Sequence, residues 1–360
     1  MIYQNLIINK SIWNKLEKMF HSNKIPHALL FHGPEGTGKE AHAIELASLL
    51  SYKTKEDLEK IKIFQHPNIH LITPLIKDKN IKKNSNALDA LSKKSLEDFI
   101  EMKKQKMLNP YQKIKFQKTS TILINSIRDI KKNIRNHNPN KYNIYLIFDA
   151  EKLCYPRNEA GNALLKILEE PPKNTIFVLV ASEKQKIMDT ILSRCCDFYF
   201  KKIKTEKIVE YLNKNHYQNE SQKILSILCN NNLNLIIELI DKKINIEVLI
   251  EKAKMLINDI IDNKSCQKYS LFLENLFKSD KQEFEIYIKI IIIILNDLNK
   301  ITDDYGNCVI LDKQINVKKI NYNQSIEIIE KYYSQFNQNL NPSIGFFSMI
   351  IELKRTLNSA

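Results

Sequence analysis

A glycine-rich segment near the start of the chain constrains the fold more than any other feature. Residues 33–39 read Gly-Pro-Glu-Gly-Thr-Gly-Lys and fit the first seven positions of the phosphate-loop motif G-x-x-x-x-G-K-[ST]. A short apolar run at 27–31 precedes the loop, and residues 40–50 follow it with helical periodicity. This is the strand–loop–helix context that a phosphate loop requires. The sequence therefore predicts an α/β fold built around a phosphate-binding loop.

The eighth position of the motif departs from the pattern. Glu40 stands where a Ser or Thr hydroxyl would ligate Mg²⁺, and its carboxylate brings negative charge close to the phosphates. We expect Gly33, Gly36, Gly38 and Lys39 to form a degenerate phosphate loop without hydrolytic chemistry of its own. No cofactor is required on this interpretation, and residual binding of ATP or ADP is left open.

A second metal position raises the same question. Nucleotide hydrolases of this kind place an Asp at the end of an apolar strand to hold Mg²⁺, and here the strand at 143–148 is followed by Asp149. Aligning residues 150–153, Ala-Glu-Lys-Leu, with the tail of a D-E-A-D-K-M type of motif puts Phe148 at the metal position. Shifting the register by one residue would make Asp149 the ligand instead. The first register is favoured because it keeps the downstream match.

Strands and helices alternate along the first half of the chain. Further apolar runs at 68–72, 175–181 and 197–200 predict a parallel sheet with helices on both faces. Residues 77–118 are polar and lysine-rich, and we expect an inserted, partly helical surface segment there. Helical periods dominate after residue 204. The predicted domains are a nucleotide-binding-like core at 1–204, a small helical domain at 205–245 and a helical bundle at 246–360.

Composition adds weaker constraints. The net charge of +14, from 55 basic and 41 acidic residues, suits a nucleic-acid partner. The excess is mostly lysine in a chain rich in Ile and Asn, as an AT-biased genome produces, so the support is weak. The six cysteines form no C-x-x-C pair, which predicts reduced thiols in a cytoplasmic protein. No targeting signal is expected, and the apolar run at 286–295 is too short for a membrane span and predicts a buried helix.

Residues 190–195, Thr-Ile-Leu-Ser-Arg-Cys, place an arginine after a short helix on the rim of the sheet domain. Arg194 cannot easily reach its own phosphate loop there, but it can reach that of a neighbouring subunit. An arginine finger on a neighbour's γ-phosphate contributes ~10³–10⁵ in rate. From the residues alone, an exposed arginine in a local salt bridge is the simpler interpretation.

Four segments carry a resemblance to a known family when they are read in order. They are Pro-His-Ala-Leu-Leu-Phe-His-Gly-Pro-Glu-Gly-Thr-Gly-Lys at 26–39, His-Pro-Asn at 66–68, Asn-Ala-Leu-Leu-Lys-Ile-Leu-Glu-Glu-Pro-Pro at 162–172, and the Ser-Arg-Cys segment. Together they resemble the clamp-loader subunits of bacterial DNA polymerase III, of the delta-prime type. The resemblance covers about the first 200 residues.

The resemblance implies an AAA+ module at 1–204, a lid at 205–245 and a collar at 246–360 through which subunits assemble into a ring. It implies gamma/tau and delta subunits, the sliding clamp and primer–template DNA as partners, and it implies no membrane. Subunits of this type commonly do not hydrolyse ATP and instead act on ATP held by a neighbour. Carried over, Arg194 would be the finger in trans, with Ser193 and Cys195 as its frame.

One departure and two alternatives remain. Many relatives carry a four-cysteine zinc module after the loop helix, but residues 51–65 contain no cysteine, so no zinc and no other metal is expected. An active gamma/tau-like ATPase is the main alternative, against which Glu40 and Phe148 argue. An unrelated basic, helical DNA-binding protein is the other, against which the intact Ser-Arg-Cys and Leu-Glu-Glu-Pro-Pro segments argue. The segment at 77–118 has no assigned function.

Overall fold

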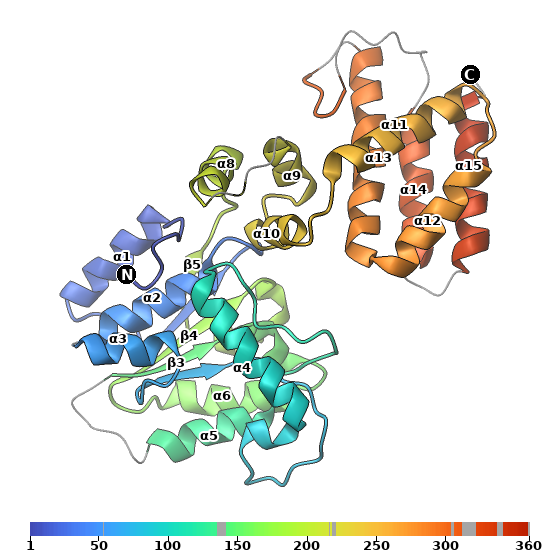
Figure 1. The fold of residues 1–360 in the computed structure, drawn as a ribbon. Coiled ribbons are helices and arrows are strands. Elements are labelled where there is room, and N and C mark those ends of the chain that lie inside the picture. Colours follow the sequence, from blue (N-terminus) through green and yellow to red (C-terminus); the bar gives the residue numbers. More distant parts are fainter. Residues whose placement is uncertain are drawn as a thin grey trace. The chain divides into compact units, whose positions relative to one another are not determined.

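The computed structural model describes most of the chain. The described residues are 1–52, 54–134, 142–215, 217, 221–303, 306–311, 322–336 and 341–358. They fall into two units, Met1–Asn215 with Asn232–Leu235 and His216–Asn231 with Ile236–Ala360 (Figure 1). The predicted domain boundaries after residues 204 and 245 stay predictions.

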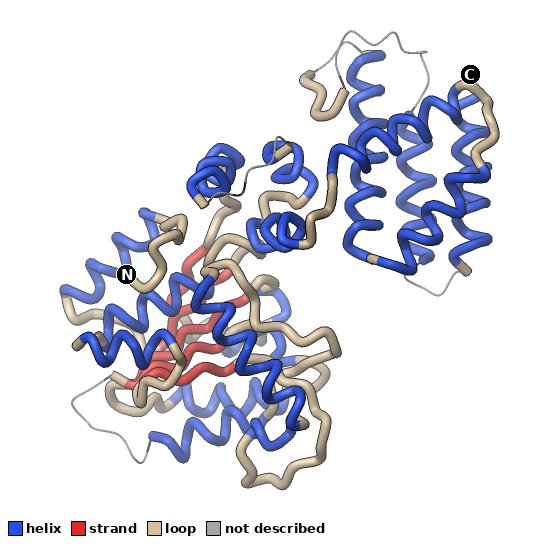
Figure 2. The backbone as a smooth tube through the Cα atoms, viewed as in Figure 1, coloured by secondary structure: helices blue, strands red, loops and turns tan. Residues whose placement is uncertain are grey.

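A five-stranded sheet in the order β2-β3-β4-β1-β5 forms the centre of the first unit (Figure 2). Its strands are β1 (Ala28–His32), β2 (Ile69–Ile72), β3 (Asn143–Ile147), β4 (Thr175–Ala181) and β5 (Cys196–Tyr199). All four strand pairs are parallel. The central strands β3 and β4 are buried along their whole length, as the continuous apolar runs predict. The predicted α/β fold class with a parallel sheet is confirmed.

Helices cover both faces of this sheet. Successive strand side chains point to opposite faces, so Leu29 and Phe31 join one hydrophobic cluster and Leu30 joins the other. The first cluster includes residues of α1 (Lys10–His21), α2 (Lys39–Ser51) and α3 (Lys55–Lys62). The second includes residues of α5 (Ile124–Ile134), α6 (Glu159–Glu169) and α7 (Asp189–Leu192). The remaining helices of this unit are α4 (Lys93–Leu108), α8 (Thr205–Lys214) and the 3₁₀ turns η1 (Ala87–Ala90), η2 (Ala150–Cys154) and η3 (Lys184–Lys186).

Two helices of the first unit have no counterpart among the predicted elements. Helix α1 is capped at its N-terminus by Asn9, whose side chain accepts a hydrogen bond from the Ile12 amide. Helix α3 begins with a capping box, in which the side chains of Thr54 and Asp57 each accept a hydrogen bond from the other's amide. The Thr-x-x-Asp spacing is therefore a signal in the sequence for the start of α3.

The described part of the second unit consists of helices and the loops between them, without a strand. Its helices are α9 (Gln222–Leu228), α11 (Ile246–Ile261), α12 (Gln267–Ser279), α13 (Lys281–Thr302), α14 (Tyr322–Phe336) and α15 (Pro342–Asn358), while α10 (Leu233–Asp241) begins in the first unit. Helix α13 contains the run at 286–295 and buries most of it, as predicted. Among the described helices, none is both long and apolar enough to cross a membrane.

Candidate functional site at the phosphate loop

The phosphate loop keeps the backbone shape that its glycines allow. It follows the carboxyl end of β1 and leads into α2, whose first turn is capped by Gly38 in the left-handed region, with φ of 79°. Gly36 has φ of 72°, and a Cβ added there would lie 2.3 Å from Oδ1 of Asn232. Only glycine fits both the conformation and the contact. The loop is therefore a formed structural element and not a remnant of sequence.

Lys39 does not point into an open phosphate site. Its ammonium is buried and donates hydrogen bonds to the carbonyl oxygens of Gly33 and Pro34, both at 2.6 Å. Burial, with the nearby positive charge of Lys113, lowers the pKa of Lys39 to about 8. The lysine that would reach the phosphates in a working loop is thus bonded to the loop's own backbone.

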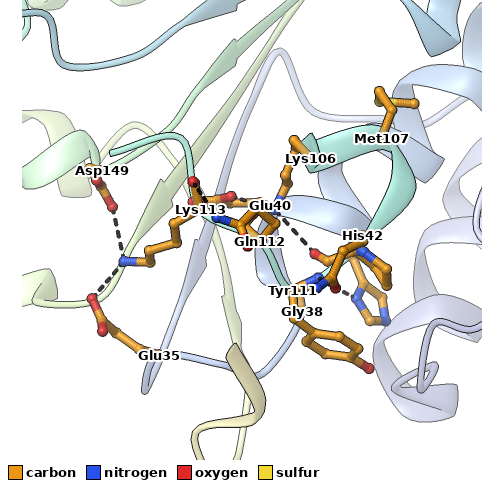
Figure 3. A network of polar contacts seen from close by, with 12 residues as sticks. Glu35, Gly38, Glu40, His42, Lys106, Met107, Tyr111, Gln112, Lys113 and Asp149 are labelled. Atoms are coloured by element: carbon orange, nitrogen blue, oxygen red, sulfur yellow. Dashed lines mark hydrogen bonds and ion pairs between the residues drawn. The ribbon is translucent and has the colours of Figure 1, made fainter. Parts of the chain in front are cut away.

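Glu40 forms a buried ion pair with a lysine from the inserted segment. The Nζ of Lys106, near the end of α4, lies 2.5 Å from Oε2 of Glu40. The same ammonium donates to the carbonyl oxygens of Gln112 at 2.7 Å and Pro110 at 3.1 Å (Figure 3). Three acceptors match the three N–H groups of a lysine, and the Lys106 side chain is only 1% exposed. Burial lowers the pKa of Lys106, and the charge of Glu40 opposes that shift.

A second lysine of the same segment lies across the loop. The Nζ of Lys113 is 2.5 Å from Oε1 of Glu35 and 3.4 Å from Oδ1 of Asp149. Burial alone would lower the pKa of Lys113, but the carboxylates of Asp149, Glu35 and Glu40 outweigh it and hold the pKa above its usual value. Lys113 is therefore a permanent cation at this site.

The two candidates for the second metal position lie beside these two lysines. Phe148 is 2% exposed in the hydrophobic core, and the Nζ of Lys106 is 5.9 Å from the centre of its ring. Asp149 has φ of 47° and lines the loop, where its carboxylate pairs with Lys113. Burial raises the pKa of Asp149, and Lys113 opposes the shift. Which of the two residues takes the metal position stays a prediction. A lysine ammonium lies near each of them, that of Lys106 near Phe148 and that of Lys113 near Asp149.

Little space remains between the loop and the inserted segment. The cavity at the loop has a volume of about 20 Å³ and is lined by residues 36–40, Lys106, Pro110, Tyr111, Lys113, Asp149 and residues 180–182. This volume is of the order needed for a single water, whereas pockets for cofactor-sized ligands are roughly 300–1,000 Å³. Across the part of the chain that the structure describes, no group of three or more His, Cys, Asp or Glu side chains is arranged to hold a metal ion.

Arg194 lies away from this cavity, after α7, and does not line it. Its guanidinium pairs with Oε1 of Glu169 at 3.1 Å and donates to the carbonyl oxygen of Thr190 at 2.7 Å. The side chain is 34% exposed. The local salt bridge that the residues alone suggested is therefore present, and it joins the Ser-Arg-Cys segment to the end of α6.

The two predicted frame residues sit on either side of Arg194. The Ser193 hydroxyl donates to the carbonyl oxygen of Thr190 at 3.1 Å, which ties it to the same turn as the arginine. Burial raises the pKa of Cys195 to about 12, so its side chain stays a neutral thiol. The role of all three residues as a finger and its frame stays a prediction.

The comparison with known families decides the relationship. The family model described as "DNA polymerase III, delta subunit" matches residues 8–204, more than half of the chain. The chain belongs to this family. The resemblance that the four sequence segments carry is thereby confirmed.

Relatives of this delta-subunit family member include several DNA polymerase III subunits. The chain is 30% identical to the tau subunit of Bacillus subtilis over 59% of its own length and 31% of that protein's. It is 25% identical to the delta' subunit of the same organism over 69% of its own length and 62% of that protein's. A gamma subunit-related protein from Thermotoga maritima has a solved structure that matches with a TM-score of 0.42 and 15% identity, over 95% of this chain and 99% of that one. The chain thus spans less than two thirds of the length of the tau subunit and of the delta' subunit.

The prediction of a partly helical segment at 77–118 is confirmed by α4, but its placement at the surface is wrong for several of its residues. Lys106, Tyr111, Ile114 and Phe116 are all buried. Ile114 and Phe116 pack in a hydrophobic cluster with Phe99, and Lys106 is the positive partner that the buried Glu40 requires. Sequence reasoning named Glu40 but missed Lys106 and Lys113. The available signal for these lysines was a carboxylate at a normally buried position, in a chain that also carries an unexplained lysine-rich insertion.

A buried histidine next to the loop gives a pH-dependence prediction. Nδ1 of His42 donates to the carbonyl oxygen of Gly38 at 2.8 Å, and Nε2 accepts from the Asn9 amide at 3.0 Å, so the ring is neutral. Burial lowers its pKa to about 4 from 6.5. Between these two pH values the His42 ring is protonated in the unfolded chain but neutral in the folded chain. The free energy of unfolding is therefore unaffected by this group above about pH 6.5, and it decreases by about 3 kcal/mol as the pH drops toward 4.

The measurement is urea unfolding of the wild type and of His42→Gln at about pH 7 and about pH 4.5. We expect the variant to be less stable at neutral pH but to lose less stability on acidification, because the titrating ring is gone. His21→Gln, at an exposed position of α1, serves as the matched control and should follow the wild type. Equal losses in wild type and His42→Gln would contradict the assignment.

Proposed function

We propose that this chain is a delta-prime-type subunit of the bacterial replicative clamp loader that does not hydrolyse ATP itself. It would act with gamma/tau and delta subunits to place the sliding clamp on primer–template DNA. Membership of the delta-subunit family supports the clamp-loader assignment. The match to a delta' subunit over 69% of the chain supports the finer one.

The observation that carries the proposal is the pairing of Glu40 with Lys106. In a working loop the eighth position holds Mg²⁺ through a neutral hydroxyl. Here that position is a carboxylate whose oxygen lies 2.5 Å from a buried ammonium. A subunit with this arrangement would lack the hydroxyl that ligates the metal, and the carboxylate in its place is already paired with an ammonium.

Arg194 would serve the ATP held by an adjacent subunit. Its present partner, Glu169, is 46% exposed, and ion pairs in such settings are worth only ~0–1 kcal/mol. A γ-phosphate offers a larger charge and bidentate acceptor geometry, for which a guanidinium is well suited. The local ion pair would thus hold the side chain in place without preventing its transfer to a neighbour's phosphate.

An active gamma/tau-like motor is the second candidate, and the 30% identity to a tau subunit favours it. The two candidates differ in what the isolated chain does. We expect the purified chain to show no Mg²⁺-dependent ATP hydrolysis above background, and to join a complex when mixed with gamma/tau and delta subunits. Lys39→Ala is the control, since any hydrolysis that survives this change comes from a contaminant. Hydrolysis by the isolated chain that Lys39→Ala abolishes would favour the motor instead.

A further inference from the structure

The segment at residues 106–113, here named the lysine plug, fills the phosphate-loop site from within the same chain. It follows from the end of α4 and contributes Lys106, Pro110, Tyr111 and Lys113 to the walls of the small cavity at the loop. We propose that the lysine plug is a built-in replacement for the metal–nucleotide complex, which closes the site to ATP and ADP and keeps this domain in one nucleotide-independent state. This inference concerns the chain's own loop and does not depend on the proposed role of Arg194.

The charges of the site balance without any ligand. Four carboxylates act on the loop, those of Glu35, Glu40, Asp149 and Glu151. The cations that act on them are Lys39, Lys106 and Lys113, with Lys115 beside Glu35. A nucleotide entering this network would have to displace the two plug lysines and would then meet the uncompensated carboxylates. Like charges at these distances in a buried site repel strongly. Nucleotide binding is therefore opposed by charge as well as by volume.

Tyr111 closes the side of the site next to the helix start. A Cβ on Gly38 would lie 3.3 Å from the Tyr111 ring, so the ring covers the amino end of α2, where a phosphate would otherwise bind. The Tyr111 hydroxyl accepts a hydrogen bond from the Ile7 amide at 2.8 Å, and its ring meets that of Tyr211 edge to face with centroids 5.3 Å apart. The plug thus contacts both the N-terminal segment and α8.

The plug is also anchored on the side away from the loop. The Tyr3 hydroxyl donates to the carbonyl oxygen of Lys106 at 3.0 Å. Phe99 of α4 packs in a hydrophobic cluster with Ile114 and Phe116, which flank the plug. Opening the site would break these contacts together with the two ion pairs. Segments with many buried contacts and few exposed backbone hydrogen bonds open rarely.

The first test is direct binding of ATP and ADP to the full chain, with and without Mg²⁺, by titration calorimetry and thermal unfolding. We expect no saturable heat and no rise in Tm at nucleotide concentrations up to about 1 mM, because a ligand at 100 times its Kd would stabilise the chain by about 2.7 kcal/mol. Saturable binding below that concentration would overturn the inference. It would leave the proposed function standing, since a subunit can bind ATP without hydrolysing it.

The second test is hydrogen–deuterium exchange of the amides at 36–40 and 106–113. We expect slow exchange that is unchanged by Mg²⁺ and ATP, and exchange as fast as in an exposed loop would overturn the inference. The double variant Glu40→Thr with Lys106→Met removes both charges of the buried pair and should speed exchange in the plug by roughly ten-fold or more. The matched control, Glu101→Thr with Lys104→Met, removes an exposed ion pair of the same helix and should change nothing. Equal exchange in both variants would show that the pair does not hold the plug.

Discussion

Replacing Glu40 by alanine is expected to lower the free energy of unfolding by about 3–5 kcal/mol. The change leaves the ammonium of Lys106, which is 1% exposed, without its carboxylate partner, and breaking a buried ion pair from one side carries a cost of about this size. The two backbone carbonyls that also accept from Lys106 satisfy only two of its three N–H groups and do not neutralise its charge. Urea unfolding at neutral pH, followed by circular dichroism, measures the loss.

A double variant shows whether the charge or the volume of Glu40 matters. Glu40→Ala combined with Lys106→Met removes both charges and should recover most of the lost stability, since well-packed apolar replacements of buried pairs are often neutral. Glu101→Ala removes the exposed partner of Lys104 on α4 and should cost less than about 1 kcal/mol. If Glu40→Ala lowered the free energy of unfolding no more than Glu101→Ala does, the Glu40–Lys106 ion pair would not be a buried one.

Replacing Arg194 by alanine in a reconstituted complex is expected to reduce ATP turnover at the neighbouring site by about 10³-fold or more. The guanidinium would no longer stabilise the charge that develops on the neighbour's γ-phosphate. Assembly should be unaffected, because the side chain is 34% exposed and its ion pair with Glu169 is local. DNA-stimulated ATPase activity of the complex, with gel filtration of the same sample, measures both quantities.

Two further variants separate a finger from a general loss of charge. Arg194→Lys keeps the charge but not the planar, bidentate geometry, and should restore little of the turnover. Arg157→Ala removes an exposed arginine that pairs with Glu159 at 3.8 Å, and should leave turnover unchanged. Unchanged turnover in Arg194→Ala, with the complex intact, would remove the arginine finger from the proposed function and leave the salt bridge with Glu169 as its only role.

The sequence predicted the sheet and the loop because both depend on local patterns. The run at 175–181 is apolar at nearly every position, and the structure buries every residue of β4. The glycines of the loop are fixed by backbone conformation at single positions, as Gly38 shows. Such features depend on residues that are close together in the sequence, so they can be predicted without knowledge of the rest of the fold.

The lysine plug could not be predicted in this way. Glu40 and Lys106 are 66 positions apart, and nothing in the local sequence distinguishes Lys106 from its exposed neighbour Lys104. Periodicity placed a partly helical segment there but gave no partner for it. Local sequence also left the register at Phe148 and Asp149 ambiguous. These two residues are adjacent after β3, yet Phe148 lies in the core and Asp149 lines the loop.

The buried pair between Glu40 and Lys106 also limits how this chain can change over generations. A glutamate at position 40 or a lysine at position 106 that arose alone would have been a buried charge without a counter-charge. Once both are present, restoring a hydroxyl at position 40 alone leaves Lys106 without its carboxylate, so the two positions are coupled. A return to a hydroxyl at position 40 is therefore expected to need a compensating change at position 106.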